Sequence, residues 1–449
     1  MSRFERITSH AVLFLVAGLM TVLLNPIHPA APAKAATVEE VISDGGIKAY
    51  LVREPSVPFI SLSLYFKGGA ATDPAGKEGL AYFVSGMIDE GAGPYDSQAY
   101  RAELEDNAIS ISFDADRDGF SGDMRTLNDT RDHAFELLRL ALTEPRFDAE
   151  PLERIRAQLI ADLRRREQDP DYLSALAWFK AAYPSHPYGR PTRGTLDSVE
   201  TISADDMRGF VAGRLALDNL VIGVAGDITA DELGPLLDKT FSGLPATAAA
   251  IDVAETQPVT GELIITEMPI PQSVVTFGHK GLARNDADYY AAYVANYILG
   301  GGGFSSRLTE EVREKRGLAY SVYSYMYEAD FSPMWLGGVA TKNEQVAQSI
   351  ELIEAEVIRM SEGDISAEDL ANAKTYLTGS FPLRLTSNRQ VSKTLVGMQL
   401  ADLGLTYLDE RNGFIEALTL DDVQRGAQRL LSGDLLISVV GQPQGLDGS

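Results

Sequence analysis

The chain has 449 residues, no cysteine, and 39 basic against 64 acidic side chains, which gives a net charge of -25. The lack of cysteine excludes disulfides, thiolate zinc sites and a Cys nucleophile. A chain this acidic would repel phosphates, so nucleic acid is not an expected partner. The length suits two domains of about 200 residues each. The acidity would suit basic or extended peptide substrates, although solubility alone is a sufficient explanation for it.

Residues 1–35 have the three-part pattern of a secretory signal peptide. Arg3 and Arg6 form a short basic region, residues 11–24 are apolar and uncharged, and a stretch of small residues ends at Ala35. The apolar run of about 14 residues is shorter than the ~20 that a membrane-spanning helix needs. We therefore expect cleavage after Ala35 and export without a stable membrane anchor. An uncleaved anchor is the alternative.

The first half of the mature chain combines strands with amphipathic helices. Alternating or continuous apolar runs predict strands at residues 47–52, 58–66 and 219–225. Apolar residues three and four positions apart predict helices at residues 131–142, 151–166 and 230–241. A further helical pattern begins at Gly79.

Composition changes at residues 244–258, which are rich in Ala, Pro and Thr and show no clear period. We interpret this stretch as a linker. It would separate an N-terminal domain of residues 36–243 from a C-terminal domain of residues 259–449.

The pattern of the first half recurs after the predicted linker. Strands are predicted at residues 262–266 and 273–277 and a helix at residues 286–299. Late in the first half, I-S-A-D-D-M at residues 202–207 precedes a helix and a strand; late in the second half, L-T-L-D-D-V at residues 418–423 does the same. These blocks lie about 215 residues apart and suggest two copies of one α+β module. Chance similarity between two short blocks is the alternative.

The predicted helix after Gly79 has the sequence G-L-A-Y-F-V-S-G-M at residues 79–87. It resembles the zinc helix of the pitrilysin/processing-peptidase family, the inverzincins, whose pattern is G-L-A-H-x-x-E-H-M. In that pattern two His on one helical face hold zinc, the Glu between them activates the zinc-bound water, and a later Glu completes the site. The resemblance spans residues 38–442. It implies two homologous α/β-sandwich-like modules in a clamshell arrangement, each a mostly antiparallel sheet with helices packed on it.

Carried onto this sequence, the family's zinc site is degenerate. The first His position is Tyr82, the Glu position is Ser85 and the second His position is Gly86. The distal Glu position is Asp162, and only this carboxylate survives in kind. We therefore expect this chain to bind no zinc and to be inactive as a peptidase on its own.

No other motif supplies an obvious replacement. Outside the predicted signal peptide the His residues are His133, His186 and His279. His133 has Glu136 one helical turn away but no second His, so we expect it on a solvated helix face. His186 begins the segment H-P-Y-G-R-P, which resembles a common family segment with a structural role. The Gly-x-Ser-x-Gly elbow of serine hydrolases does not occur.

The second half contains a stronger functional signal. The glycine run at residues 300–303 lacks the form of a P-loop, so phosphate binding is not predicted. Gly317 is typical of the end of a helix that would contain Arg313. Residues 320–327 predict a strand. Its alternate positions would place three tyrosines on one face: Tyr323, Tyr325 and Tyr327.

This stretch resembles the arginine–tyrosine site of the same family, in which an Arg near a helix end and a Tyr seven residues later face the zinc. In the R-x-x-x-G-x-x-Y frame here, these residues are Arg313 and Tyr320. The resemblance implies that they bind substrate by donating hydrogen bonds to its carbonyl and to the developing oxyanion. The residues alone leave two alternatives: Arg313 as a surface charge paired with Glu310 or Glu314, and Tyr320 as a core aromatic.

The resemblance also implies a division of labour. In bacterial members and in the mitochondrial processing peptidase, one subunit keeps H-x-x-E-H and the other can keep the arginine–tyrosine pair. We expect this chain to be the non-zinc subunit of a heteromeric zinc metallopeptidase in the periplasm of a Gram-negative bacterium. A homologous H-x-x-E-H subunit would carry the zinc, and peptides or unfolded protein segments would be the substrates.

Two alternatives remain. The chain could be a non-catalytic scaffold or peptide-binding protein of the same fold, as are the core subunits of respiratory complex III that resemble this family. It could also be a self-sufficient hydrolase with a site that the motifs do not reveal.

Overall fold

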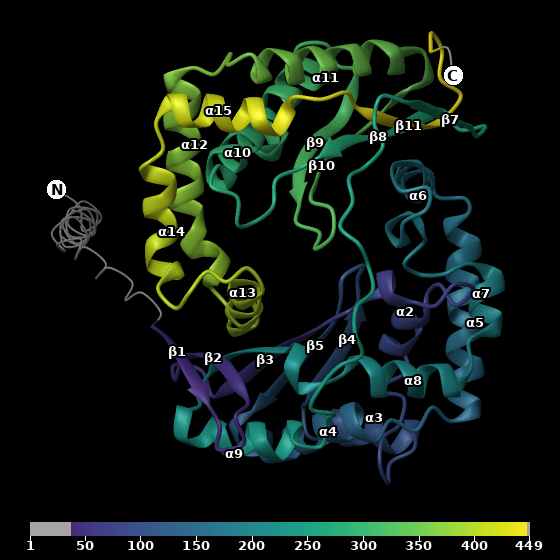
Figure 1. Cartoon of the computed structure of the whole chain (residues 1–449), viewed down its shortest axis with the longest axis vertical. Coiled ribbons are helices and arrows are strands. Elements are labelled where there is room, and N and C mark those ends of the chain that lie inside the picture. Colours follow the sequence, from purple (N-terminus) through teal and green to yellow (C-terminus); the bar gives the residue numbers. More distant parts are fainter. Residues whose placement is uncertain (1–36, 447–449) are drawn as a thin grey trace, which may run out of the picture. The chain divides into compact units, whose positions relative to one another are not determined.

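Two β-sheets organise the computed structural model, which describes residues 37–446 and leaves the predicted signal peptide outside the described residues (Figure 1). The first sheet has the strand order β1-β2-β6-β3-β5-β4 and the second has the order β7-β11-β8-β10-β9. The strands of the first sheet are β1 (Val38–Ile42), β2 (Lys48–Arg53), β3 (Phe59–Lys67), β4 (Ser110–Ala115), β5 (Gly119–Leu127) and β6 (Leu220–Gly226). Those of the second sheet are β7 (Leu263–Glu267), β8 (Gln272–Lys280), β9 (Ala319–Tyr327), β10 (Met334–Lys342) and β11 (Leu436–Gly441).

The two sheets have the same topology, which confirms the predicted α+β repeat. Strands β2 to β6 correspond in chain order to β7 to β11, and β1 is an addition to the first sheet. In each copy the first strand pairs in parallel with the last, β2 with β6 and β7 with β11. The remaining pairs are antiparallel. Both sheets are therefore mostly antiparallel, as predicted.

Helices from both halves cover these sheets. The first half has α2 (Leu80–Ser85), α3 (Ser97–Asp106), α4 (Arg131–Thr143), α5 (Ala149–Arg166), α6 (Pro170–Ala182), α7 (Leu196–Thr201), α8 (Ala204–Arg214) and α9 (Ala230–Phe241). The second half has α10 (Tyr289–Asn296), α11 (Val346–Ser361), α12 (Ala367–Ser380), α13 (Asn388–Leu400), α14 (Tyr407–Glu416) and α15 (Leu420–Leu431). The predicted helices at residues 131–142, 151–166 and 230–241 correspond to α4, α5 and α9.

The repeated sequence blocks form the same local structure in both halves. Ser203 caps α8 and Thr419 caps α15, each in a capping box with an Asp three residues later. The hydroxyl accepts the Asp backbone N–H and the carboxylate accepts the cap N–H, so two free donors at each helix end are satisfied. Each helix then leads into the last strand of its sheet. The repeated D-D motif is therefore a capping signal.

Each sheet is also covered by a helix from the other half. Helix α6 packs on β8 and β11, where the Trp178 indole N–H donates to the Leu436 carbonyl oxygen at 2.9 Å. Helix α13 packs on β3 and β6, where the Ser392 and Ser63 hydroxyls lie 2.9 Å apart. This second helix explains why Ser61 and Ser63 are buried, although the alternation along β3 is typical of a strand with one solvated face.

Some boundaries differ from the predictions. Helix α10 begins three residues later than the predicted start, because the N–H of Asp288 donates to the Asp286 carboxylate in a turn at 2.9 Å. It continues into a π-helical turn, Tyr297–Gly301. Residues 242–262 contain no helix or strand, which is compatible with the predicted linker. The exact domain boundaries and the clamshell arrangement stay predictions. Within residues 37–446, no helix has the length and apolarity to cross a membrane.

Candidate functional site

Helix α2 carries the positions of the degenerate zinc motif. It has only six residues and begins after Gly79, whose φ of 90° is left-handed. A Cβ at Gly79 would lie 2.6 Å from the Arg193 carbonyl oxygen, so only glycine permits this close approach. The Asp73 carboxylate accepts the backbone N–H groups of Gly79 and Ala81 at 2.8 and 3.0 Å. The start of the helix is thereby fixed against the turn that contains Arg193.

Two of the motif positions, Ser85 and Gly86, offer no side chain that could act as a zinc ligand. The Ser85 hydroxyl donates to the Tyr82 carbonyl oxygen at 2.8 Å, and Ser85 is buried. Gly86 ends the helix and has no side chain. A Cβ there would lie 3.7 Å from Ile155 on α5, which is an ordinary contact. The structure therefore leaves space at Gly86 but offers no ligand.

Tyr82 and Asp162, the other two positions, are joined by an arginine. The Arg193 guanidinium stacks on the Tyr82 ring, 4.2 Å from its centroid, and donates to the Tyr82 hydroxyl. Its Nη1 lies 3.6 Å from Oδ2 of Asp162. Asp162 also accepts hydrogen bonds from Arg165 and, at 2.7 Å, from Arg166. The structure thus brings together the predicted positions on α2 and α5, with Arg193 between them.

The electrostatics of this cluster suit an ion pair. Partial burial would raise the pKa of Asp162, but the hydrogen bond from Arg166 and the charges of Arg166, Arg165 and Arg193 outweigh it and hold the pKa below its ordinary value. Asp162 is therefore ionised, and its charge is neutralised by arginines. This arrangement links α5 to α2 without a metal.

The residues present do not fit the zinc ion that the family implies. Protein zinc sites use Cys thiolates, His nitrogens and Asp or Glu carboxylates, and neither Ser85 nor Gly86 supplies such a group. The oxygens of Asp162 face guanidinium groups, and the charge of Arg193 would repel a dication. Among residues 37–446, no group of three or more His, Cys, Asp or Glu side chains is arranged to hold a metal.

The three histidines of residues 37–446 lie in separate environments. His133 contacts the Glu103 carboxylate of α3 at 2.8 Å, whereas Glu136 binds Arg139. His186 accepts the backbone N–H of Tyr188 and contacts the Ala254 carbonyl oxygen at 2.9 Å. His279 is buried beside a tryptophan. His186 fits its predicted structural role. His133 stays partly exposed on its helix, and it also contacts a second helix through Glu103.

Arg313 and Tyr320, the predicted arginine–tyrosine pair, lie in contact. The Arg313 guanidinium is 5.0 Å from the centroid of the Tyr320 ring and 4.6 Å from that of Phe304. Its Nε also pairs with the Glu314 carboxylate at 3.3 Å, so the surface ion pair considered for this residue exists. Tyr320 is 83% exposed, which excludes the core alternative. Its hydroxyl has no hydrogen-bond partner among the described residues.

Local backbone structure positions this pair. Arg313 belongs to a π-helical segment, Thr309–Glu314, which ends where the N–H of Gly317 donates to the Arg313 carbonyl oxygen at 2.8 Å. Gly317 has a φ of 63°, as the predicted helix stop requires. Strand β9 begins at Ala319, and its second residue, Tyr320, is exposed to solvent. The glycine run packs closely behind this strand, because a Cβ at Gly300 would lie 2.4 Å from Ser324 Oγ.

The tyrosines of β9 form an aromatic row, as predicted. Tyr323 and Tyr325 are 50% and 42% exposed, and their rings are stacked with centroids 6.2 Å apart. Burial raises the pKa of Tyr327 to about 12, because this residue lies deeper. The row offers an aromatic surface beside the arginine–tyrosine pair.

Two residues that contribute to these clusters, Arg193 and Phe304, are not part of the sequence motifs. Arg193 lies far from both zinc-motif helices in sequence, and only its position after the H-P-Y-G-R-P segment could have drawn attention to it. Phe304, 75% exposed, follows the glycine run and stacks on Arg313. An exposed aromatic residue after a glycine run was the available signal.

Comparisons with known proteins identify a family for the chain. Residues 48–196 match the family described as "Insulinase (Peptidase family M16)", and residues 201–377 match "Peptidase M16 inactive domain". The chain is 28% identical over 379 residues to "Non-peptidase homolog YmxG" of Helicobacter pylori, covering 84% of this chain and 86% of that protein. It is 24% identical over 404 residues to "Uncharacterized zinc protease YmxG" of Bacillus subtilis, covering 90% and 98%. A crystal structure of a peptidase M16 inactive domain from Pseudomonas fluorescens is similar, with a TM-score of 0.85 and 27% identity, covering 92% and 99% of the two chains.

Proposed function

Because the chain belongs to the M16 peptidase family as one of its inactive members, we propose that it is the substrate-binding, non-zinc subunit of a heteromeric zinc peptidase. The partner would be a homologous subunit with an intact H-x-x-E-H helix. The substrates would be peptides or unfolded protein segments. The exposed contact between Arg313 and Tyr320 carries this proposal.

The chemistry of the pair suits amide hydrolysis. Negative charge develops on the carbonyl oxygen as the peptide bond is attacked, and preorganised donors stabilise it. The Tyr320 hydroxyl is one such donor, free of any hydrogen bond to residues 37–446. Arg313 contacts Glu314 through Nε, and neither of its Nη groups has a hydrogen-bond partner among the same residues. The Arg313 guanidinium packs against the rings of both Phe304 and Tyr320, which restricts its motion. It therefore loses little conformational freedom when it binds substrate.

The remainder of the chemistry would come from the partner. Its zinc would polarise the carbonyl, and its Glu would activate the attacking water. In this chain the corresponding space between α2 and α5 is taken by the Arg193 guanidinium. Arg313 and Tyr320 can therefore serve catalysis only beside a zinc that another subunit brings.

Peptide binding without hydrolysis is a second candidate. The exposed aromatic row of Tyr323 and Tyr325 would suit it, because aromatic rings bind peptide side chains at low entropic cost. Under either proposal the chain would act after export, in the periplasm of a Gram-negative bacterium. This location rests on residues 1–35 alone.

Substitution of the pair in the mixed complex tests the proposal. We expect Arg313→Gln and Tyr320→Phe each to lower kcat by roughly 100-fold, the effect of removing one oxyanion donor. Arg316→Gln is the matched control, because Arg316 lies three residues along and, within residues 37–446, pairs only with Glu311. Peptide hydrolysis that stays within a few-fold of the unsubstituted complex in both variants would favour the scaffold or peptide-binding alternative.

A further inference from the structure

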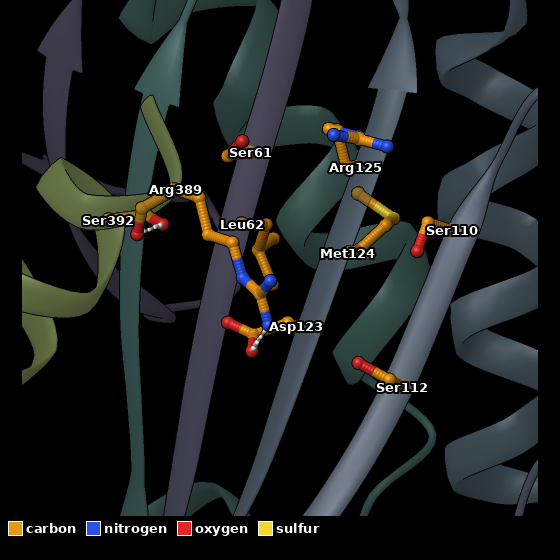
Figure 2. Close-up of a pocket in the computed structure, with 9 residues that line it drawn as sticks. All are labelled: Ser61, Leu62, Ser110, Ser112, Asp123, Met124, Arg125, Arg389 and Ser392. Atoms are coloured by element: carbon orange, nitrogen blue, oxygen red, sulfur yellow. Dashed lines mark hydrogen bonds and ion pairs between the residues drawn. The ribbon is translucent and has the colours of Figure 1, made fainter. Parts of the chain in front are cut away.

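A polar pocket lies on the face of the first sheet that meets α13 (Figure 2). It has a volume of about 130 Å³, and its polar lining comes from three strands of the first half and one helix of the second. The residues that concern us are Ser61, Ser110, Ser112, Asp123, Arg125 and Arg389. We call this the Arg125 pocket. It is separate from the arginine–tyrosine pair and from the zinc-motif positions, none of which lines it.

Strand register arranges these side chains in two rows across the sheet. In one row Asp123 on β5 pairs with Ser63 on β3 and Ser112 on β4. In the next row Arg125 on β5 pairs with Ser61 on β3 and Ser110 on β4. Side chains directly opposite on neighbouring strands lie close enough to interact. Each row is therefore one charged group between two hydroxyls.

The Asp123 row is fully neutralised. The Ser63 hydroxyl donates to Oδ1 of Asp123 at 2.8 Å. Its Oδ2 accepts from Arg389 at 3.2 Å and lies 2.9 Å from the Lys393 ammonium. Figure 2 shows Arg389 extending from α13 to this carboxylate. Both carboxylate oxygens thus have partners, and two cations face one anion.

The Arg125 row lacks the anion that would complete it. Arg125 is exposed and has neither a hydrogen bond nor an ion pair to any residue in the described range 37–446. The Ser61 hydroxyl is buried, at 2% exposure of its residue, and has no partner. The Ser110 hydroxyl also has none within that range. Buried polar groups are almost always paired, so the unpaired Ser61 hydroxyl marks a position where a ligand atom would supply the missing hydrogen bond.

Charge in and beside the pocket favours an anionic ligand. Arg389 and Lys393 both pair with the Asp123 carboxylate, and Arg125 adds a third positive charge to the pocket, although the chain as a whole carries a net charge of -25. Helix α13 begins at Asn388, and Arg389 in its first turn lines the pocket, so the positive end of the helix dipole lies beside it. A guanidinium fork binds a planar carboxylate with two parallel hydrogen bonds, and a pocket of about 130 Å³ suits a group of that size.

We propose that Arg125, together with the hydroxyls of Ser61 and Ser110, binds a carboxylate of a bound peptide. The inference rests on the proposed function, because peptides are the ligands assigned there. The carboxylate belongs either to the C-terminus of the peptide or to a Glu or Asp side chain. Binding there would anchor one end of an extended peptide at the interface of both halves of the chain.

The test measures binding of a fluorescently labelled, unstructured peptide to the full mature chain. Four versions combine a free or amidated C-terminus with an internal Glu or Gln. We expect loss of the relevant carboxylate to weaken binding of the peptide about tenfold. We expect Arg125→Gln to weaken binding of the intact peptide by the same factor. In the Arg125→Gln protein, removal of that carboxylate should weaken peptide binding no further. Whichever of the two changes weakens binding identifies the source of the carboxylate.

Two further variants separate binding from folding. Arg53→Gln removes an exposed strand arginine of the same sheet that has no ion-pair partner within residues 37–446, and it should leave peptide affinity unchanged. Ser61→Ala removes a hydroxyl with no protein partner, so the melting temperature should not fall while affinity drops about threefold.

The outcomes distinguish this inference from the proposed function. Equal binding of all four peptides to the unsubstituted protein and to Arg125→Gln would overturn the carboxylate site and leave peptide binding intact. A complete lack of peptide binding in the unsubstituted protein would overturn both.

Discussion

Arg193 and Tyr82 form a stacked, hydrogen-bonded pair at the place where the family's zinc site begins, with the guanidinium 4.2 Å from the ring centroid. The same guanidinium lies 3.6 Å from Oδ2 of Asp162 on α5. In active relatives of this fold a metal would join these two helices. Here the Arg193 side chain contacts residues of both helices.

This arrangement predicts a structural role for Arg193. Substitution Arg193→Ala removes a cation–π contact and an ion pair, and we expect the free energy of unfolding to fall by about 1 to 2 kcal/mol. Arg165→Ala is the control: Arg165 also pairs with Asp162, but its side chain is 78% exposed. Its loss should cost about 0.5 kcal/mol or less. Urea denaturation of both variants measures the difference, and equal destabilisation would contradict a special role for Arg193.

Arg193 should also oppose zinc binding in a chain whose ligands are restored. The backbone at Gly86 is helical, with φ of -87° and ψ of -3°, so a side chain there can join one at position 82 on the same face. We expect the triple variant Tyr82→His, Ser85→Glu, Gly86→His to bind zinc at least about tenfold more weakly than the same variant with Arg193→Ala added, because the guanidinium repels the dication.

Competition with a zinc-sensitive chelating dye measures both affinities. The unsubstituted chain serves as the control and should take no zinc from the dye. Tight binding that is indifferent to Arg193 would mean that the guanidinium moves aside freely.

A carboxylate cluster predicts how stability depends on pH. Burial, with the nearby charges of Asp330 and Asp116, raises the pKa of Asp118 to about 6, although a hydrogen bond from Tyr188 opposes the shift. The backbone N–H of Asp330 donates to Asp118 at 3.2 Å and so joins a loop of the first half to the β9–β10 turn of the second.

The direction of this pH dependence follows from the number of protons that the folded and unfolded states bind. An unfolded Asp has a pKa of about 3.9, so between about pH 4 and pH 6 the folded state holds more protons, and stability falls as the pH rises through this window. Asp330→Asn removes one repelling charge. We expect this variant to melt at a higher temperature than the unsubstituted protein at pH 7.5, with a smaller gain at pH 5. An equal gain at both pH values would show that repulsion is not the cause.

The fold can be predicted well from the sequence, because much of it is encoded locally. Apolar periodicity located β2, β3, β6 and the long helices, and the D-D capping blocks before α8 and α15 revealed the repeat. What escaped prediction depends on contacts between distant segments. The burial of Ser61 and Ser63 requires α13, which arrives from the other half of the chain.

The candidate site also combines features that sequence motifs predict with features that depend on contacts between distant segments. Motif spacing located Tyr82, Ser85, Gly86 and Asp162, and a frame of eight residues located Arg313 and Tyr320. Spacing cannot show that Arg193 reaches Tyr82 from a turn 111 residues away. Nor can it show that register places Arg125 between Ser61 and Ser110, because strand pairing is a tertiary property.

The most direct test of the central claim is peptide hydrolysis by this chain alone, by an H-x-x-E-H homologue alone, and by their mixture, after size-exclusion chromatography has verified that a complex forms. We predict no hydrolysis by this chain, activity of the mixture well above the sum of its parts, and loss of that activity with a zinc chelator. Chelator-sensitive hydrolysis by this chain alone would contradict the account, and so would a verified complex no more active than the zinc subunit by itself.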